Sequence, residues 1–325
     1  MKVAGSRIFV TGGSGFIGTN LVELFSSMGA TLLNFDINGP LDNRQKSLWV
    51  RGDIMNAGDL KGAMTTFCPD IVIHLAARTD CDENATVEKG YAVNVEGTAN
   101  VLKAAAGTPS VRHLIAASTQ YVCRPGYLPA NDEDFSPHTV YGESKARMEK
   151  LVRGYGLRMP WTIIRPANIW GPWHMRYRRE VWRVISRGLY LHPGRKPVIR
   201  TYGYVKNVVE QIARIIESDV SKIAGRVFYL GDPPDDIYKW VNAFSLSLRG
   251  RPAPVVPRTV VRMIAMLGDI LCAFGLSFPL TSSRYRSMTQ DYVVPTDRTL
   301  AVFGPCPYSL DEGVSQTVRW LRTWK

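Results

Sequence analysis

The chain has 325 residues, of which 45% are hydrophobic and 21% charged, a balance typical of a folded globular protein and unlike that of a disordered chain. Its five cysteines are widely spaced and form no C-x-x-C pair, so the sequence predicts neither a disulfide framework nor a metal site and favours a reducing, cytoplasmic compartment. The formal net charge is +12, but no nucleic-acid-binding motif accompanies it, which argues against a nucleic-acid partner.

The first 165 residues alternate short β-branched segments with helical patterns. We expect strands at residues 7–10, 31–36, 48–50, 70–75, 113–118 and 161–165, and helices near residues 16–28, 56–67, 88–106 and 138–154. This alternation is typical of successive βαβ units, which form a parallel sheet with helices on both faces. We therefore predict an α/β fold with a Rossmann-type, doubly wound parallel sheet.

The alternation ends after Pro166. A segment rich in Trp, Arg and Pro follows at 167–204, then one more helix and strand, and the rest of the chain is mainly helical. We therefore assign residues to a Rossmann domain and to a smaller, mainly helical substrate-binding lobe. The Rossmann domain takes residues 1–167 and about 205–231, and the lobe takes about 168–204 and 232–325.

Charge and hydrophobicity are unevenly spread along the chain. Residues 153–214 contain thirteen Lys or Arg and two acidic residues, which is typical of a surface for an anionic ligand or of a solvated basic face. The longest apolar stretch, 263–281, contains Asp269, two glycines and a proline, so it does not predict a bilayer-spanning helix. We expect a buried or partner-facing helix there. Peripheral contact with a membrane is the alternative, because Arg258 and Arg262 precede the stretch.

A glycine-rich loop lies between the first expected strand and the first expected helix. Its sequence, T-G-G-S-G-F-I-G, places Gly12, Gly15 and Gly18 where a tight turn, close approach of a pyrophosphate and close helix packing require glycine. Phe16 and Ile17 lie in the same loop and are expected to contact the cofactor. A loop of this kind at a helix N-terminus predicts a dinucleotide-binding site.

Further cofactor contacts are expected where the next strands end. Asp36 ends the second expected strand, where a carboxylate accepts hydrogen bonds from the adenosine ribose and repels a 2′-phosphate, so the sequence predicts NAD rather than NADP. His74, in the fourth expected strand, is interpreted as a packed core histidine. The other expected contacts are Asp53, Ile54, Leu75, Ala76 and Ala77.

Tyr141 and Lys145 are four residues apart in the helix expected over 138–154, so their side chains share one face. A phenol ionises at about pH 10, but a neighbouring ammonium and a positively charged nicotinamide would both lower its pKa. Tyr141 is therefore a candidate general base for a substrate hydroxyl, and Lys145 can also hold the nicotinamide ribose. Ser118 and Thr119 end the fifth expected strand and offer a hydroxyl that orients the substrate.

At these motifs the chain resembles the extended short-chain dehydrogenase/reductases, the family of nucleotide-sugar epimerases and dehydratases. The resemblance spans nearly the whole chain and includes G-D-I, H-L-A-A, N-V-E-G-T-A-N-V-L, Y-G-E-S-K, R-P-A-N-I-W-G-P and R-T-Y-G-Y-V-K-N-V-V in family order. It implies that Thr119, Tyr141 and Lys145 form a catalytic triad. It also implies that Asn94 braces the cofactor loops and that Pro166 lies near the nicotinamide amide.

On the substrate side, the resemblance implies that Asn168 and Arg200 face a diphosphate. It leaves Arg284 and Arg286 as alternatives for a second phosphate contact. It also implies a homodimer, whose interface would be formed by the helices near 88–106 and 138–154.

One departure from the family narrows the reaction. The 4,6-dehydratases of the family carry Asp-Glu directly after the catalytic threonine, whereas this chain has Gln120 and Tyr121, so dehydration is disfavoured. The resemblance therefore implies an NAD-dependent nucleotide-sugar epimerase that inverts C4 of a hexose through a 4-keto intermediate.

Three alternatives stay open at this point. An oxidoreductase that resembles the 3β-hydroxysteroid dehydrogenases would use the same triad, and the apolar segment 255–281 could shape its pocket. A lipid-linked sugar would suit both the cationic and the apolar segments. A non-catalytic NAD-binding scaffold is the third alternative, although such proteins often lose the tyrosine or the lysine that this chain retains.

Overall fold

Seven strands form a parallel central sheet in the order β11-β6-β5-β4-β1-β2-β3. The computed structural model describes residues 1–276 and 278–324 of the chain. The strands are β1 (Arg7–Thr11), β2 (Thr31–Asp36), β3 (Trp49–Arg51), β4 (Ile71–His74), β5 (His113–Ala117), β6 (Trp161–Pro166) and β11 (Arg226–Leu230). All neighbouring pairs are parallel, which confirms the predicted doubly wound fold.

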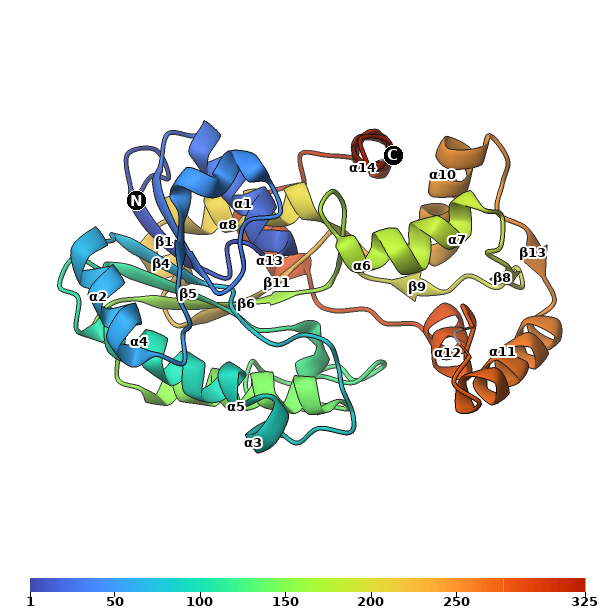
Figure 1. The fold of residues 1–325 in the computed structure, drawn as a ribbon, viewed down its shortest axis with the longest axis horizontal. Coiled ribbons are helices and arrows are strands. Elements are labelled where there is room, and N and C mark those ends of the chain that lie inside the picture. The colour runs from blue at the N-terminus through green and yellow to red at the C-terminus, as the bar shows by residue number, and fades with distance from the viewer. Residues whose placement is uncertain (277, 325) are drawn as a thin grey trace.

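Helices cover both faces of this sheet (Figure 1). One face carries α1 (Phe16–Ser27), α8 (Val205–Glu217) and α13 (Asp297–Phe303), and the other carries α2 (Ala57–Phe67), α4 (Thr98–Ala106) and α5 (Val140–Gly154). Ile8 and Val10 of β1 are buried in the core on the first face, and Phe9 is buried on the second. A strand buried on both faces needs a continuous apolar run, which is the pattern that predicted it.

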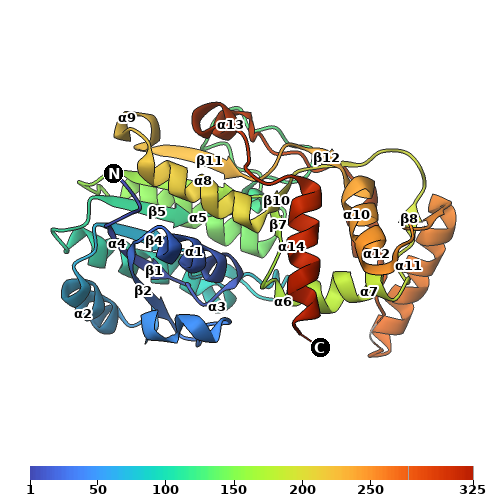
Figure 2. The same ribbon diagram turned by 90° about the horizontal axis from the view of Figure 1, so that it is seen from above.

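A second lobe lies beyond the carboxyl ends of the strands (Figure 2). It contains β7 (Asn168–Trp170), α6 (Met175–Tyr177), η4 (Arg178–Trp182), α7 (Arg183–Ser186), β8 (His192–Pro193), β9 (Ile199–Arg200), β10 (Tyr202–Tyr204), β12 (Asp235–Asp236), α10 (Ile237–Arg249), β13 (Val255–Val256), α11 (Arg258–Ala273), α12 (Ser282–Thr289) and α14 (Leu310–Arg322). Trp170 and Trp182 are each 1% exposed and pack on Phe244 of α10, with ring centroids 5.5 and 5.6 Å away. Two tryptophans of the segment 167–204 therefore fill the core of this lobe.

Shorter elements connect the strands and helices of the sheet domain. They are η1 (Asn43–Leu48), α3 (Val87–Gly90), η2 (Val93–Gly97), η3 (Gln120–Val122) and α9 (Val220–Ile223). After α12 the chain returns to the sheet, where the Phe303 ring of α13 lies 4.7 Å from the Phe228 ring of β11. The Thr299 hydroxyl also donates to the Tyr229 carbonyl at 2.7 Å. Part of the C-terminal segment therefore packs on the sheet domain, while α14 packs on α10.

The apolar stretch at 263–281 forms the end of α11 and the connection to α12. Residue 277 lies outside the described residues. Val261, Ala265 and Gly268 are buried, so one face of α11 packs on the lobe as expected. Within the part of the chain that the structure describes, no helix combines the length and the apolar character needed to cross a bilayer.

Candidate active site

A cavity of about 1020 Å³ lies between the two lobes, at the carboxyl edge of the sheet. This edge is where open α/β sheets bind their ligands. Among the described residues, the predicted positions Asp53, Asn94 and Arg286 do not line the cavity. The predicted residues that line it are Gly12, Gly15, Phe16, Ile17, Gly18, Asp36, Ile54, Leu75, Ala76, Ala77, Thr119, Tyr141, Lys145, Pro166, Asn168, Arg200 and Arg284.

The loop after β1 leaves room for a diphosphate against the backbone. Gly12 has a φ of +76°, and a Cβ on it would lie 2.5 Å from the Ala76 nitrogen. A Cβ on Gly18 would lie 2.4 Å from the Gly12 carbonyl oxygen, so both positions require glycine. Gly15 precedes α1, and no side chain caps that helix, so its first N–H groups are suited to an anion. These features fit the pyrophosphate of a dinucleotide.

Asp36 ends β2 beside this loop. Its carboxylate accepts hydrogen bonds from the backbone N–H groups of Ser14 at 3.1 Å and Asn38 at 2.9 Å. Burial raises the pKa of Asp36 above its ordinary value, and these hydrogen bonds oppose the rise. A half-buried carboxylate at this position fits a ribose diol and disfavours a 2′-phosphate.

Replacing Asp36 with alanine should weaken NAD binding by about tenfold to a hundredfold, because a hydrogen bond to a charged group contributes about 1.5–3 kcal/mol. NADP binding should be affected less, because the repulsion of its 2′-phosphate is lost at the same time. Calorimetric titration with each dinucleotide measures both affinities. The exposed Asp59 of α2 gives a matched control, Asp59→Ala. An equal loss of affinity for NAD and NADP would contradict the assigned role.

Two of the predicted residues, Asp53 and Asn94, do not line the cavity and form hydrogen bonds with the backbone instead. Asp53 accepts a hydrogen bond from the Met55 N–H at 2.9 Å, and its expected contact with adenine stays a prediction. Asn94 is fully buried in η2, accepts from the Arg78 N–H at 2.8 Å and donates to the Arg78 carbonyl at 3.1 Å. It also donates to the Ser144 hydroxyl at 2.9 Å. Asn94 therefore ties the loop after β4 to α5, an arrangement compatible with the bracing role expected from the resemblance.

Tyr141 and Lys145 lie in the first two turns of α5 and line the cavity. The helix begins after Thr139, whose hydroxyl accepts a hydrogen bond from the Gly142 N–H at 2.9 Å. Tyr141 is 7% exposed and Lys145 is 2% exposed. The Lys145 ammonium donates to the Ala117 carbonyl at 2.8 Å, which joins α5 to the end of β5. The shared helix face predicted from the spacing is therefore directed at the carboxyl edge of the sheet.

Burial shifts the pKa of each group in the direction that favours its neutral form. It raises the pKa of the Tyr141 phenol above its ordinary value, and a side-chain hydrogen bond with Thr119 opposes the rise. It lowers the pKa of Lys145 to about 8, and the negative charge of Glu149 opposes that change. The direction for Tyr141 is opposite to the one expected from a neighbouring ammonium, because a buried phenolate loses its hydration. Within the protein alone, Lys145 therefore does not make Tyr141 acidic.

Replacing Lys145 with methionine should change the pH dependence of stability. The folded pKa of about 8 lies below the ordinary value of 10.5, so the unfolded chain binds more protons between these values. The wild-type protein should therefore gain about 2 kcal/mol relative to Lys145→Met as the pH rises from about 7.5 to about 9.5. Urea unfolding at both pH values measures this difference, with Lys150→Met on the exposed face of α5 as the control. A difference that does not change with pH would contradict the burial of a charged Lys145.

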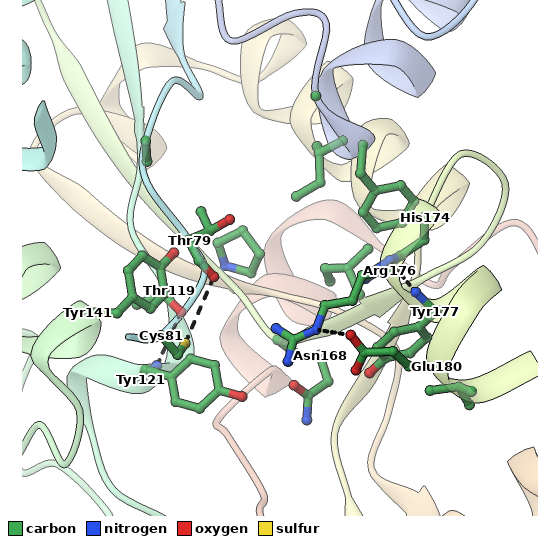
Figure 3. Close-up of a pocket in the computed structure, with 18 of the residues that line it drawn as sticks. Thr79, Cys81, Thr119, Tyr121, Tyr141, Asn168, His174, Arg176, Tyr177 and Glu180 are labelled. Carbon is green, nitrogen blue, oxygen red and sulfur yellow. Dashed lines mark hydrogen bonds and ion pairs between the residues drawn. The ribbon is translucent and has the colours of Figure 1, made fainter. Parts of the chain in front are cut away.

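Across the cavity from Tyr141, Arg176 lies beside Glu180 (Figure 3), and Arg200 and Arg284 also line the cavity. Glu180 pairs with Arg176 at 3.3 Å and with Arg284 at 3.0 Å. Arg200 is 7% exposed, donates from Nη1 to backbone carbonyls near the end of α12, and has no hydrogen-bond partner for Nε among the described residues. Asn168 lies in the same part of the cavity (Figure 3). Three arginines and one carboxylate thus line the same cavity as Tyr141.

The structure distinguishes the positions of Arg284 and Arg286 and adds cavity residues that sequence reasoning missed. Arg284 lines the cavity whereas Arg286 does not, so Arg284 is the better placed of the two. The added cavity residues come from the loop after β4, from η3 and from the second lobe. The Trp- and Arg-rich composition at 167–204 was the signal for those that lie in that segment. They include Thr79, Cys81, Tyr121, His174, Arg176, Tyr177, Glu180, Tyr202 and Trp240.

Two histidines near the site have structural partners. His74 is 1% exposed and lies between the hydroxyls of Thr11 and Thr98 at 2.7 and 2.9 Å, which confirms the prediction of a packed core histidine. His174 caps α6 by accepting a hydrogen bond from the Tyr177 N–H at 3.1 Å. Burial lowers the pKa of His174 to about 4, so it is neutral at physiological pH.

Comparison with known proteins agrees with this geometry. Residues 8–231 match the model of the NAD dependent epimerase/dehydratase family. The chain belongs to this family. It is thus an NAD-dependent enzyme of the extended short-chain dehydrogenase/reductase type, and the matched residues include both the glycine loop and the Tyr141–Lys145 pair.

Individual relatives and similar structures cover most of the chain. A 3-beta-hydroxysteroid dehydrogenase from Mycolicibacterium neoaurum is 31% identical over an alignment of 281 residues that covers 81% of this chain and 75% of that protein. An N-acetyl-alpha-D-glucosaminyl-diphospho-ditrans,octacis-undecaprenol 4-epimerase from Escherichia coli is 27% identical over an alignment of 330 residues that covers 97% of this chain and 95% of that protein. The crystal structure of a UDP-glucose 4-epimerase from Thermotoga maritima with UDP-glucose has a TM-score of 0.75 at 18% identity, covering 98% of this chain and 99% of the other.

Proposed function

We propose that this protein is an NAD-dependent nucleotide-sugar epimerase that inverts C4 of a hexose through a 4-keto intermediate. The observation that carries the proposal is the pairing of two cavity walls. Thr119 and Tyr141 lie across the cavity from Arg176 (Figure 3), and Arg200 and Arg284 also line the cavity. A sugar diphosphate between these walls would place a ring hydroxyl at the phenol and its phosphates among the arginines.

The side chains on the first wall have distinct roles in this proposal. Bound NAD would supply the hydride-transfer chemistry. Tyr141 takes the proton of the C4 hydroxyl and gives it back after the keto sugar has rotated in the cavity to present its other face. Thr119 orients the hydroxyl toward the phenol. Lys145 holds the nicotinamide ribose and, together with the charge of the oxidised cofactor, favours the phenolate form of Tyr141. The reaction begins and ends at the same redox level.

The acids that a dehydratase would need are not found near the phenol. Among the described residues that line the cavity, Asp36 and Glu180 are the only carboxylates. Asp36 lies at the end of β2, and Glu180 lies on the opposite wall, where two arginines engage it. Gln120 is fully buried, and its neighbour Tyr121 lines the cavity. Epimerisation without loss of water therefore fits this site better than dehydration.

A steroid alcohol is the second candidate substrate. The M. neoaurum relative is named as a steroid dehydrogenase, and part of the cavity is apolar. A steroid would use the same phenol but carries no phosphate for the arginines of the cavity to bind. The apolar lining residues include Leu189, Leu191, Trp240, Leu280 and Met288.

Purified protein, with no cofactor added, should interconvert the C4 epimers of a sugar diphosphate, and heating it should release NAD. The probes are UDP-glucose, UDP-N-acetylglucosamine, dTDP-glucose, GDP-mannose, N-acetylglucosaminyl-diphospho-undecaprenol and a 3β-hydroxysteroid, with products followed by NMR. Activity with the undecaprenol probe alone would contradict a nucleotide sugar as the substrate but would still support a sugar diphosphate. Net NADH formation with the steroid alone would decide for the second candidate. Failure of every sugar would defeat the proposal.

A further inference from the structure

Helix α11 is apolar on two opposite faces. Val261, Ala265 and Gly268 form the buried face that packs on the lobe. The opposite face, which we call the α11 apolar face, is exposed by 52% to 81% and consists of Met263, Met266, Leu267, Ile270 and Phe274. A surface helix normally turns polar side chains toward water, so five large apolar side chains there indicate an interaction surface.

The segment of the chain that contains α11 is rich in arginine. Residues 246–290 contain six arginines and a single acidic residue, Asp269. That carboxylate accepts a hydrogen bond from the Ser282 N–H at 3.0 Å, so it is engaged in holding the start of α12. Arg262 and Arg286 are exposed. Apolar side chains bordered by arginines are typical of helices that lie in the interface of an anionic bilayer.

The position of α11 in the molecule suits contact with a flat surface. The helix lies at the end of the second lobe, far from α2 and α4 at the other end of the molecule (Figures 1 and 2). The helices expected to form a dimer, near 88–106 and 138–154, belong to the sheet domain. A dimer formed there would leave the α11 apolar face uncovered.

The segment after α11 forms part of the cavity wall. Pro279 and Leu280 follow the helix, and both line the cavity together with Arg284 of α12. Gly268 lies so close to the backbone of Leu280 that no side chain fits between them. The exposed helix and this part of the cavity wall are therefore directly joined.

We propose that the α11 apolar face docks on the surface of an anionic bilayer, with the neighbouring arginines contacting lipid phosphates. A second copy of this chain fits less well, because a symmetric contact would bring two arginine-rich segments together. Docking in this orientation brings the cavity wall at Leu280 to the membrane. A sugar diphosphate on a lipid carrier is the substrate form that such docking would present. This last step alone rests on the proposed function, of which it keeps the sugar diphosphate and replaces the nucleotide with a lipid.

Sedimentation with vesicles tests the docking directly. The full-length protein should sediment with vesicles of equal parts phosphatidylcholine and phosphatidylglycerol. Its affinity for vesicles of phosphatidylcholine alone should be at least about tenfold lower. The triple variant Met263→Ser, Ile270→Ser, Phe274→Ser should lose at least about tenfold in affinity for the anionic vesicles. Leu128 and Leu246 are 75% and 47% exposed elsewhere, so Leu128→Ser with Leu246→Ser is the matched control and should bind as the wild type does.

Several results would overturn the docking proposal. They are a wild-type protein that stays in the supernatant, a triple variant that binds as strongly as the wild type, and a control variant that loses binding equally. Light scattering that shows a wild-type oligomer dissociated by the triple substitution, without vesicle binding, would assign the face to a second copy. Circular dichroism confirms that each variant is folded. Vesicle binding requires no turnover, so its failure is distinguishable from a failure of the proposed function.

Discussion

Replacing Tyr141 with phenylalanine should lower kcat by about a hundredfold to ten-thousandfold while NAD stays bound, because a positioned acid–base group contributes that much. The phenylalanine ring keeps the packing of Tyr141 against Tyr91 and Tyr121, whose ring centroids both lie 6.2 Å away. Only the hydroxyl beside Thr119 is lost. Epimer formation followed by NMR measures kcat, and the NAD released by heat measures cofactor occupancy.

Tyr155 provides the matched control for this experiment. It lies at the C-terminal end of the same helix, and it does not line the cavity. Tyr155→Phe should therefore retain the kcat of the wild type. If Tyr141→Phe turned over its substrate at the wild-type rate, Tyr141 would not be the base. A variant that loses turnover but keeps its biological activity unchanged would favour the non-catalytic scaffold.

Replacing Glu149 with glutamine should lower the free energy of unfolding by about 3–5 kcal/mol, the cost of leaving one partner of a buried ion pair alone. Glu149 and Arg165 are both fully buried and form two parallel hydrogen bonds of 2.8 Å that join α5 to β6. Without the carboxylate charge, the guanidinium retains only neutral partners, the Tyr229 hydroxyl and the Asp132 carbonyl. Because the charge of Glu149 also raises the pKa of Lys145, that pKa should fall further in the variant.

Urea unfolding of Glu149→Gln beside Glu143→Gln separates a buried pair from a surface pair. Glu143 lies on the same helix and pairs with Arg147, but both side chains are nearly half exposed, so its replacement should cost at most about 1 kcal/mol. The double variant Glu149→Leu, Arg165→Met should recover most of the lost stability. Equal losses for Glu149→Gln and Glu143→Gln would show that the buried pair has no special role.

The sheet could be predicted because its signals are local. Each strand is a short apolar run between turns, and the glycine loop carries its own steric requirement at Gly12 and Gly18. The spacing of Tyr141 and Lys145 likewise predicted that they share a helix face. It could not predict the direction of the Tyr141 pKa, which depends on how deeply the surrounding segments bury the phenol.

The substrate side of the cavity depends on contacts between distant parts of the chain. Glu180 and Arg284 meet across 104 residues of sequence, and Arg200 reaches the end of α12 across about ninety. Such contacts leave no periodic pattern in the sequence, so composition identified the cationic segment but not its arrangement. For α11, composition indicated an apolar helix with a buried face, but only the fold showed that a second apolar face is exposed.

The fate of the hydrogen on C4 tests the proposed chemistry most directly. A sugar diphosphate accepted in the epimerisation assay is prepared with deuterium at C4 and incubated with the enzyme in ordinary water. We predict that the 4-epimer forms with its deuterium still at C4, because only the hydroxyl proton passes through Tyr141. An epimer that carries hydrogen from water at C4 would show that a proton, rather than a hydride, left that carbon and would contradict the assignment.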